Sequence, residues 1–304
     1  MVRIAGARGT VGPVRAREPD RSGYAVRAGV RLYYEVHGDG PVTVLLLPPW
    51  SIVHSRVWKL QVPYLARHVR VVVYDARGNG RSDRPTNPAA YDDAELVADA
   101  TAVMDAVGLP DAVVVGLSMG ARVLLMLAAA HPERVRGAVF VGPALTLHDQ
   151  PNPVTDAFEQ ERDSYEGWER WNAHHWREDQ GGFAEFFFGE VFPEPHSTRH
   201  IEEAVEWALE TDAETLVATQ SPRRRVLAPA EARAAVQRVR SPALVLQGDD
   251  DRIAPLSNGM ALASALGCPL EVVAGGGHCI QARHPVWFNA RVRRFVDEVA
   301  RASP

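Results

Sequence analysis

The sequence predicts an α/β protein with a mostly parallel, doubly wound sheet, helices on both faces and one helical insertion. Continuous apolar runs, typical of strands buried on both faces, alternate with segments of helical spacing. This alternation stops between residues 146 and 227, which hold no valine-rich strand but many aromatic residues, and it resumes after residue 241. A chain of 304 residues is long enough for one large domain that carries such an insertion.

The elements follow from periodicity, in chain order. Residues 24–29 and 30–38 alternate apolar and polar side chains, which predicts an antiparallel pair of strands. Buried strands are then predicted at residues 42–49, 69–76, 111–118 and 135–144, with helices at 56–68, 92–108 and 119–132. After the insertion, strands at residues 243–250 and 269–277 alternate with helices near 256–267 and 284–300.

These elements divide the chain into three parts. Residues 1–23 have basic side chains and no strong periodicity, so we expect a disordered basic tail. Residues 24–145 and 228–304 are expected to form the core, and residues 146–227 a helical cap, or lid, inserted in it.

Composition limits the partners and the compartment. The net charge of -5 and the pI near 6.1 argue against a nucleic-acid surface. No apolar run approaches the ~18 residues of a membrane helix, and the N-terminus lacks the apolar segment of a signal peptide. Two cysteines are too few for a disulfide framework. We therefore expect a cytoplasmic protein that binds neither nucleic acid nor membrane, and the sequence leaves its oligomeric state open.

The stretch VVVGLSMGA, residues 113–121, places Ser118 between a buried strand and a helix. A sharp turn there brings the residues two before and two after the serine together, and Gly116 and Gly120 supply the small side chains it needs. Such a turn exposes the hydroxyl above the sheet, and the Met119 amide at the helix start points toward a developing oxyanion. Ser118 is therefore the candidate nucleophile.

A nucleophilic serine needs a base, and His278 follows the last predicted strand after a run of glycines. A flexible glycine loop at a strand end can aim an imidazole. His284 is a rival, but it precedes Pro285 at a helix start, where a capping role suits it better. His278 is therefore the candidate base.

Three acids, Asp249, Asp250 and Asp251, follow the preceding strand. They cannot all share one small site without repulsion, so one is expected to turn inward. The spacing from Gly248 favours Asp251, with the other two as alternatives. The resulting order, nucleophile then acid then base, is typical of α/β-hydrolases.

On these residues the chain resembles the α/β-hydrolase superfamily over about residues 24–145 and 228–300. The resemblance is carried by GLSMG (116–120), DARGNGRSDRP (75–85), GDDDRIAP (248–255) and GGGHCIQARHP (275–285). It implies a serine hydrolase with a helical cap, a Ser-His-Asp triad and no metal or organic cofactor. The expected reaction is cleavage of a carboxylic ester or lactone through an acyl-enzyme.

The oxyanion loop departs from the pattern of the family. Many members have His-Gly after the strand that here reads VLLL, whereas this chain has Pro48-Pro49-Trp50. Prolines have no amide N–H, so the first free amide is that of Trp50. Trp50 and Met119 are therefore the expected oxyanion donors.

The aromatic insertion is expected to shape the pocket of a bulky, largely apolar substrate. The candidate binding residues are Trp168, Trp171, Trp176 and Phe187. His174, His175, His196 and His200 lack an acid or cysteine that would complete a ligand set, so we expect solvated lid residues and no metal site.

Three other functions remain open on sequence grounds. The same acyl-enzyme could serve an acyltransferase or cyclase. A carbon–carbon bond hydrolase or perhydrolase resembles this chain equally well. A ligand-binding or signalling module could also use this fold, although such a module has no need of a complete triad.

Overall fold

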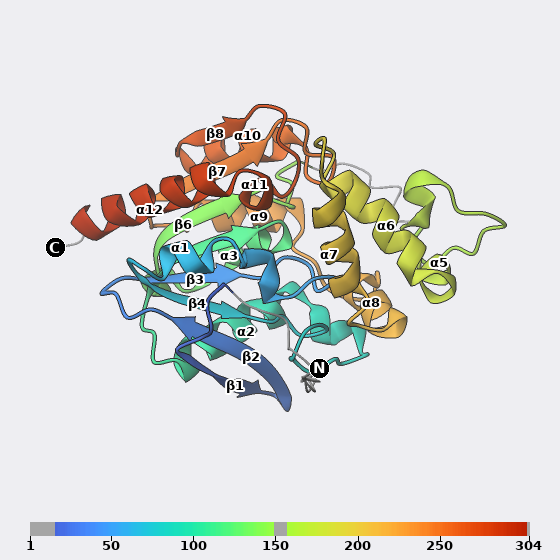
Figure 1. Ribbon diagram of the computed structural model, residues 1–304, viewed down its shortest axis with the longest axis horizontal. Helices are drawn as coiled ribbons and strands as arrows, with labels where there is room; N and C mark the ends of the chain where they lie inside the picture. The colour runs from blue at the N-terminus through green and yellow to red at the C-terminus, as the bar shows by residue number, and fades with distance from the viewer. Residues whose placement is uncertain (1–15, 149–156, 303–304) are drawn as a thin grey trace, which may run out of the picture.

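A computed structural model describes residues 16–148 and 157–302. Within them lies an eight-stranded sheet in the order β1-β2-β4-β3-β5-β6-β7-β8 (Figure 1). The strands β1 and β2 and the strands β2 and β4 pair antiparallel, and every other neighbouring pair is parallel. The strands are β1 Arg21–Arg27, β2 Val30–His37, β3 Thr43–Leu47, β4 Arg70–Tyr74, β5 Ala112–Leu117, β6 Val135–Val141, β7 Ala243–Gly248 and β8 Leu270–Val273.

The central strands are apolar throughout because helices cover both of their faces. Val113, Val114 and Val115 of β5 have no exposed surface. The edge strand β8 is shorter than the run that predicts it, and Val272 on it is 44% exposed. The apolar runs therefore locate the strands correctly and overestimate their length at the edge.

The helices of the core alternate with these strands as predicted. They are α1 Val62–Leu65, α2 Asp93–Ala106, α3 Met119–Ala130, α9 Pro229–Val236, α10 Leu256–Leu266, α11 Ile280–Arg283 and α12 Pro285–Ala302, with short 3-10 turns η1 Ser55–Trp58, η2 Pro88–Tyr91 and η3 Pro132–Arg134. The single helix predicted over residues 56–68 is wrong: η1 and α1 are separate. Pro63 cannot donate a hydrogen bond to the carbonyl of Lys59, which breaks a continuous helix.

The first strand begins inside the predicted tail. Arg21, Ser22 and Gly23 pair with Val36, Glu35 and Tyr34 of β2, which corrects the expectation that disorder extends to residue 23. The part of that expectation on residues 1–15 lies outside the described residues.

Between β6 and α9 the chain forms helices that gather at one end of the sheet (Figure 1). They are η4 Gly167–Arg170, α5 Ala173–Glu178, α6 Gln180–Val191, α7 Thr198–Ala208 and α8 Ala213–Gln220. We call residues 157–227 the helical insertion; residues 149–156 are outside the described part of the chain. Its interior is aromatic, with Trp176 and Phe183 fully buried. Nowhere in the described residues is a helix long and apolar enough for a membrane span.

Candidate active site

Ser118 stands at the turn between β5 and α3. Its φ of 57° and ψ of -120° form a conformation that residues other than glycine rarely adopt, at a cost of ~1–3 kcal/mol. The Ser118 amide donates to the carbonyl of Val141 at 2.8 Å, and the Ser118 carbonyl accepts from the amide of Ala121 at 3.0 Å. Neighbouring main chain of the sheet and helix therefore fixes the strained turn.

Two glycines make this turn possible. A Cβ atom on Gly116 would lie 2.4 Å from the carbonyl oxygen of Gly120, and one on Gly120 would lie 2.5 Å from the carbonyl oxygen of Pro48. Either distance is far below van der Waals contact. The short distance at Gly116 is the crowding that the motif predicts. The short distance at Gly120 shows that the Pro48–Trp50 loop packs closely against the start of α3.

His278 and Asp251 meet beyond the ends of β8 and β7. The Nδ1 atom of His278 lies 2.8 Å from Oδ2 of Asp251, and the side chains are 5% and 0% exposed. The other carboxylate oxygen, Oδ1, accepts from the amides of Ile253 and Ala254 at 2.9 Å and 2.8 Å, while Gln247 donates to Oδ2 at 3.0 Å. Because a carboxylate oxygen only accepts hydrogen bonds, the contact with Asp251 favours the tautomer with the proton on Nδ1 and with Nε2 as the acceptor.

The alternative candidates for the acid and the base, Asp249, Asp250 and His284, make other contacts. Asp249 accepts from the amide of Gly275 at 2.6 Å, and Asp250 pairs with Arg252 at 3.4 Å on the surface. His284 ends α11, and its carbonyl accepts from the amide of Phe288 in α12. Of the three acids, it is Asp251 that contacts the imidazole of His278.

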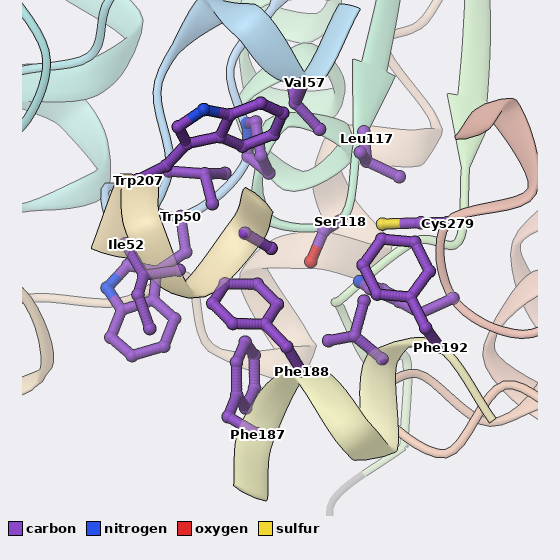
Figure 2. Close-up of a pocket in the computed structure, with 15 residues that line it drawn as sticks. Trp50, Ile52, Val57, Leu117, Ser118, Phe187, Phe188, Phe192, Trp207 and Cys279 are labelled. Carbon is purple, nitrogen blue, oxygen red and sulfur yellow. The ribbon is translucent and has the colours of Figure 1, made fainter. Parts of the chain in front are cut away.

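Ser118 and His278 line one cavity between the sheet and the helical insertion. The cavity has a volume of about 50 Å³. Figure 2 shows the hydroxyl of Ser118 among Phe188, Phe192 and Cys279. The remaining lining is apolar: Pro49, Trp50, Ile52, Val53, Val57, Leu117, Phe187, Val191, Ala204 and Trp207. Among the described residues, Ser118 and His278 make no direct hydrogen bond.

Cys279 is a second potential nucleophile in this cavity. Burial raises the pKa of its thiol to about 12. The thiol therefore stays protonated at neutral pH and reacts poorly, because the thiolate is the nucleophilic form. Ser118 therefore remains the candidate nucleophile.

Of the expected oxyanion donors, Trp50 lines this cavity, whereas Met119 directly follows Ser118 and lines a second cavity with Pro48 and Pro49. Trp50 is buried in the loop after β3, and among the described residues its amide N–H has no acceptor. Met119 begins α3, where the first amides of a helix have no partner in the helix itself. Both amides are thus available for a ligand.

Of the four candidate substrate-binding residues, one lines the cavity and three do not. Phe187 lines the cavity. Trp176 is fully buried inside the insertion, Trp171 packs on Trp50 with ring centres 4.9 Å apart, and Trp168 packs on Phe186 at 5.3 Å. These three are not among the lining residues.

The cavity instead receives three aromatic residues that the sequence reasoning did not select: Phe188, Phe192 and Trp207. Phe188 and Phe192 are spaced i, i+4, which places them on one side of α6 and its end. That spacing is visible in the sequence. The continuous run at residues 186–188 conceals which phenylalanine faces the core, because it has no polar residue to mark the outer face.

The loop that carries His278 is held by the helical insertion. The amide of His278 donates to the carbonyl of Val191 at 3.2 Å, and the amide of Gly277 donates to Oε1 of Glu194 at 2.8 Å. Sequence reasoning missed Glu194, since no local motif links it to a loop more than 80 residues away.

The histidines of the insertion are dispersed. His175 is buried against Tyr165, and desolvation lowers its pKa. His200 contacts Phe192 and Arg283, and desolvation followed by the charge of Arg283 lowers its pKa. In the described part of the chain, no three His, Cys, Asp or Glu side chains are grouped so that they could hold a metal ion.

Known proteins share this architecture. The chain is 29% identical over 286 residues to "Putative carbamate hydrolase RutD" of Caulobacter vibrioides, covering 88% of this chain and 95% of that one. It is 31% identical to 2-hydroxymuconate semialdehyde hydrolase of Pseudomonas sp. strain CF600, covering 88% and 87%. The structure of an esterase from Exiguobacterium antarcticum superposes with a TM-score of 0.76 at 18% identity, over 90% of this chain and 98% of that one. The family of the alpha/beta hydrolase fold matches residues 43–285, and the chain belongs to that family.

Proposed function

We propose that this α/β-hydrolase is a serine hydrolase that cleaves uncharged, apolar carboxylic esters or lactones through an acyl-enzyme on Ser118. One observation carries the proposal. The strained serine opens into the same apolar cavity as an imidazole whose Nδ1 atom lies 2.8 Å from a buried carboxylate. This combination supplies a nucleophile, a base and an orienting acid.

In the proposed mechanism, Nε2 of His278 takes the proton of Ser118 as Oγ attacks the substrate carbonyl. Asp251 holds the Nδ1–H tautomer and stabilises the imidazolium that forms. His278 then protonates the leaving alcohol as the carbon–oxygen bond breaks. A water molecule, deprotonated by His278, then attacks the acyl-enzyme, and His278 returns this proton to Oγ of Ser118 as the acyl carbon–oxygen bond breaks and the acid leaves.

The amides of Trp50 and Met119 are the proposed oxyanion donors. The loss of one such donor typically costs ~100- to 1000-fold in rate. Both belong to backbone that packs tightly, because the Pro48 carbonyl contacts Gly120 next to Met119. The oxyanion would therefore meet donors that are already in place.

The lining of the cavity favours an uncharged substrate. Among the described lining residues there is no Arg, Lys, Asp or Glu. The polar side chains of the lining are those of Ser118, Cys279 and His278. 2-Hydroxymuconate semialdehyde carries a carboxylate, which this lining would leave unpaired at a high cost in free energy. An ester with an apolar acyl group fits the lining better than that compound or a small polar carbamate.

We further propose that residues 146–227 act as a cap whose movement admits the substrate. The helical insertion contributes Phe187, Phe188, Phe192 and Trp207 to the cavity wall. The volume of about 50 Å³ is small for the bulky substrate that the aromatic content suggests. A bulky substrate would have to displace these side chains, whereas a short acyl chain would need less movement.

The first test is the intact mass of the protein after incubation with a fluorophosphonate. We expect one adduct on the wild type, none on Ser118→Ala, and an undiminished adduct on Ser264→Ala, which changes an exposed serine on α10. No adduct on folded wild-type protein would contradict the proposal and favour a ligand-binding module.

A substrate panel then separates the chemical classes. p-Nitrophenyl esters of two to ten acyl carbons are compared with a carboxylate-bearing ester, a lactone and a carbon–carbon substrate. We expect kcat/KM for the uncharged esters to exceed that for the charged ester by ~100-fold, because the charge would be buried without a partner. Turnover of the carbon–carbon substrate alone would reject the ester assignment.

A further inference from the structure

We propose that Thr219 of the helical insertion is a positioning residue. Its hydrogen bond to the indole of Trp50 fixes the direction of the Trp50 backbone N–H, the proposed oxyanion donor. The inference rests on the proposed function. It concerns two parts of one residue that lie in different surroundings. Pro49 and Trp50 both line the cavity that contains Ser118, and Figure 2 shows the indole of Trp50 pointing away from Ser118.

The indole packs as part of the insertion rather than of the sheet. Its ring centre lies 4.9 Å from that of Trp171, 5.6 Å from Trp176 and 5.4 Å from Phe187. All three belong to the helical insertion. A residue of the core thereby contributes its side chain to the aromatic interior of the segment that covers the site.

One hydrogen bond fixes the orientation of this ring. Nε1 of Trp50 donates to Oγ1 of Thr219 at 2.7 Å, and Thr219 in turn donates to the carbonyl of Leu216 at 2.6 Å. Trp50 is 6% exposed and Thr219 is 2% exposed. A buried donor without its acceptor is costly, so the indole is held to α8 whenever the insertion is seated.

The backbone of Trp50 has few other supports. Its carbonyl accepts from the amide of Val53 at 3.2 Å, and in the described structure its amide has no acceptor. The prolines before it fix their own φ angles, so the direction of the Trp50 N–H depends on ψ of Pro49 and, relative to the Trp50 side chain, on φ of Trp50. A side chain locked at its far end restricts χ1 and, with it, the allowed backbone torsions.

The position of the helical insertion on the core therefore affects how well the Trp50 amide stabilises the oxyanion. A misplacement of about 1 Å at a reacting group can cost ~100-fold in rate. Loss of the Thr219 acceptor lets the indole rotate and should therefore reduce the rate of the chemical step. Ground-state binding in the apolar cavity should change little.

The experiment compares Thr219→Val with Thr219→Ser and Thr215→Val. Valine has the shape of threonine without the acceptor, and serine retains the acceptor. Thr215 is the matched control because it is also buried in α8, and its hydroxyl contacts Asp212 at 2.9 Å instead of Trp50. For Thr219→Val we expect about a tenfold decrease in kcat and in fluorophosphonate labelling rate, with less than about a twofold change in KM. Thr219→Ser should restore most of both rates, and Thr215→Val should leave both unchanged.

A double-mutant cycle tests whether the effect passes through the indole. Trp50→Phe retains a packed ring without the N–H donor, so it should cost about as much as Thr219→Val. In the Trp50→Phe background, Thr219→Val should then cost almost nothing more. Melting temperatures of all variants identify any that fail to fold.

The outcomes separate two failures. An active wild type with an unchanged kcat in Thr219→Val, or equal losses in Thr219→Val and Thr215→Val, overturns the positioning role alone. A change in KM without a change in kcat overturns it as well, because that result indicates uniform binding. A folded wild type that neither turns over esters nor reacts with the fluorophosphonate overturns the proposed function, and the positioning role with it.

Discussion

The two sides of the candidate site are held by different parts of the molecule. The sheet and its flanking loops hold Ser118 and Asp251, through the carbonyl of Val141 and the amides after Asp251. The helical insertion holds the backbone of His278 through Val191 and the indole of Trp50 through Thr219. The proposed nucleophile and acid are thus fixed by core packing, whereas the proposed base and one proposed oxyanion donor depend on the helical insertion.

This difference predicts a contrast in how the site fails. Damage to the supports in the sheet should abolish chemistry or destabilise the fold. Damage to the supports in the insertion should give graded losses of rate in a protein that stays folded.

The largest effect is expected for Asp251→Asn. The amide can no longer stabilise the imidazolium of His278, and it favours the wrong tautomer, so kcat should fall by ~10,000-fold. Ester hydrolysis is measured beside Asp250→Asn, which alters an exposed neighbour paired with Arg252 and should retain full activity. Equal activity of the two variants would remove Asp251 from the proposed triad.

A glycine pair compares the packing of the two parts. Gly116→Ala should lower the free energy of unfolding by ~1–3 kcal/mol, because the new Cβ would lie 2.4 Å from the carbonyl oxygen of Gly120. Gly189→Ala in α6 should raise it by ~0.5–1 kcal/mol, since no atom lies within 4 Å of the new Cβ and alanine favours helices. Chemical denaturation measures both. A stabilising Gly116→Ala would contradict the tight turn.

A graded loss is expected at the loop that carries His278. Glu194→Ala removes the acceptor for the amide of Gly277 and should reduce kcat by about fivefold, equivalent to ~1 kcal/mol. Glu194→Gln retains a side-chain oxygen at the same position and should lose less. If both variants match the wild type while the melting temperature is unchanged, the insertion does not hold this loop in a way that affects catalysis.

The smallest effect is expected for the pH dependence of the melting temperature, through His175 in the helical insertion. Desolvation lowers the pKa of His175 in the folded state, so its stabilising contribution is present above the unfolded pKa and is lost as the pH falls below about 6.5. His175→Phe preserves the ring packed on Tyr165 and removes the titration. The melting temperature should therefore fall less between pH 7.5 and 5.5 in the variant than in the wild type. Parallel slopes would contradict the prediction.

The sequence is informative where a local rule decides the structure. Three consecutive valines predict β5, and Gly116, Ser118 and Gly120 predict the turn that follows it, because crowding within a few residues dictates both. Asp251 could be preferred over its neighbours by spacing alone. These features require no knowledge of distant contacts.

Other features depend on contacts that local patterns do not encode. The destination of the Trp50 indole is set by a residue 169 positions away, and the sequence directs attention to its amide alone. Likewise, the cavity takes Phe188 and Trp207 rather than Trp171, because the packing between helices selects the inward face. The apolar residues of α6, which include three consecutive phenylalanines, do not form one narrow stripe, so the sequence pattern leaves that choice undetermined.

The burial of Trp50 among the aromatic rings of the helical insertion also affects whether the insertion can be exchanged between hydrolases. Helical insertions of this kind look exchangeable, since the segment is one continuous stretch of sequence between two strands of the sheet, β6 and β7. Here a graft from another hydrolase would leave a large indole without its pocket and its acceptor. Recombination or directed evolution of substrate range should therefore transfer the loop around Trp50 together with residues 157–227 as one unit.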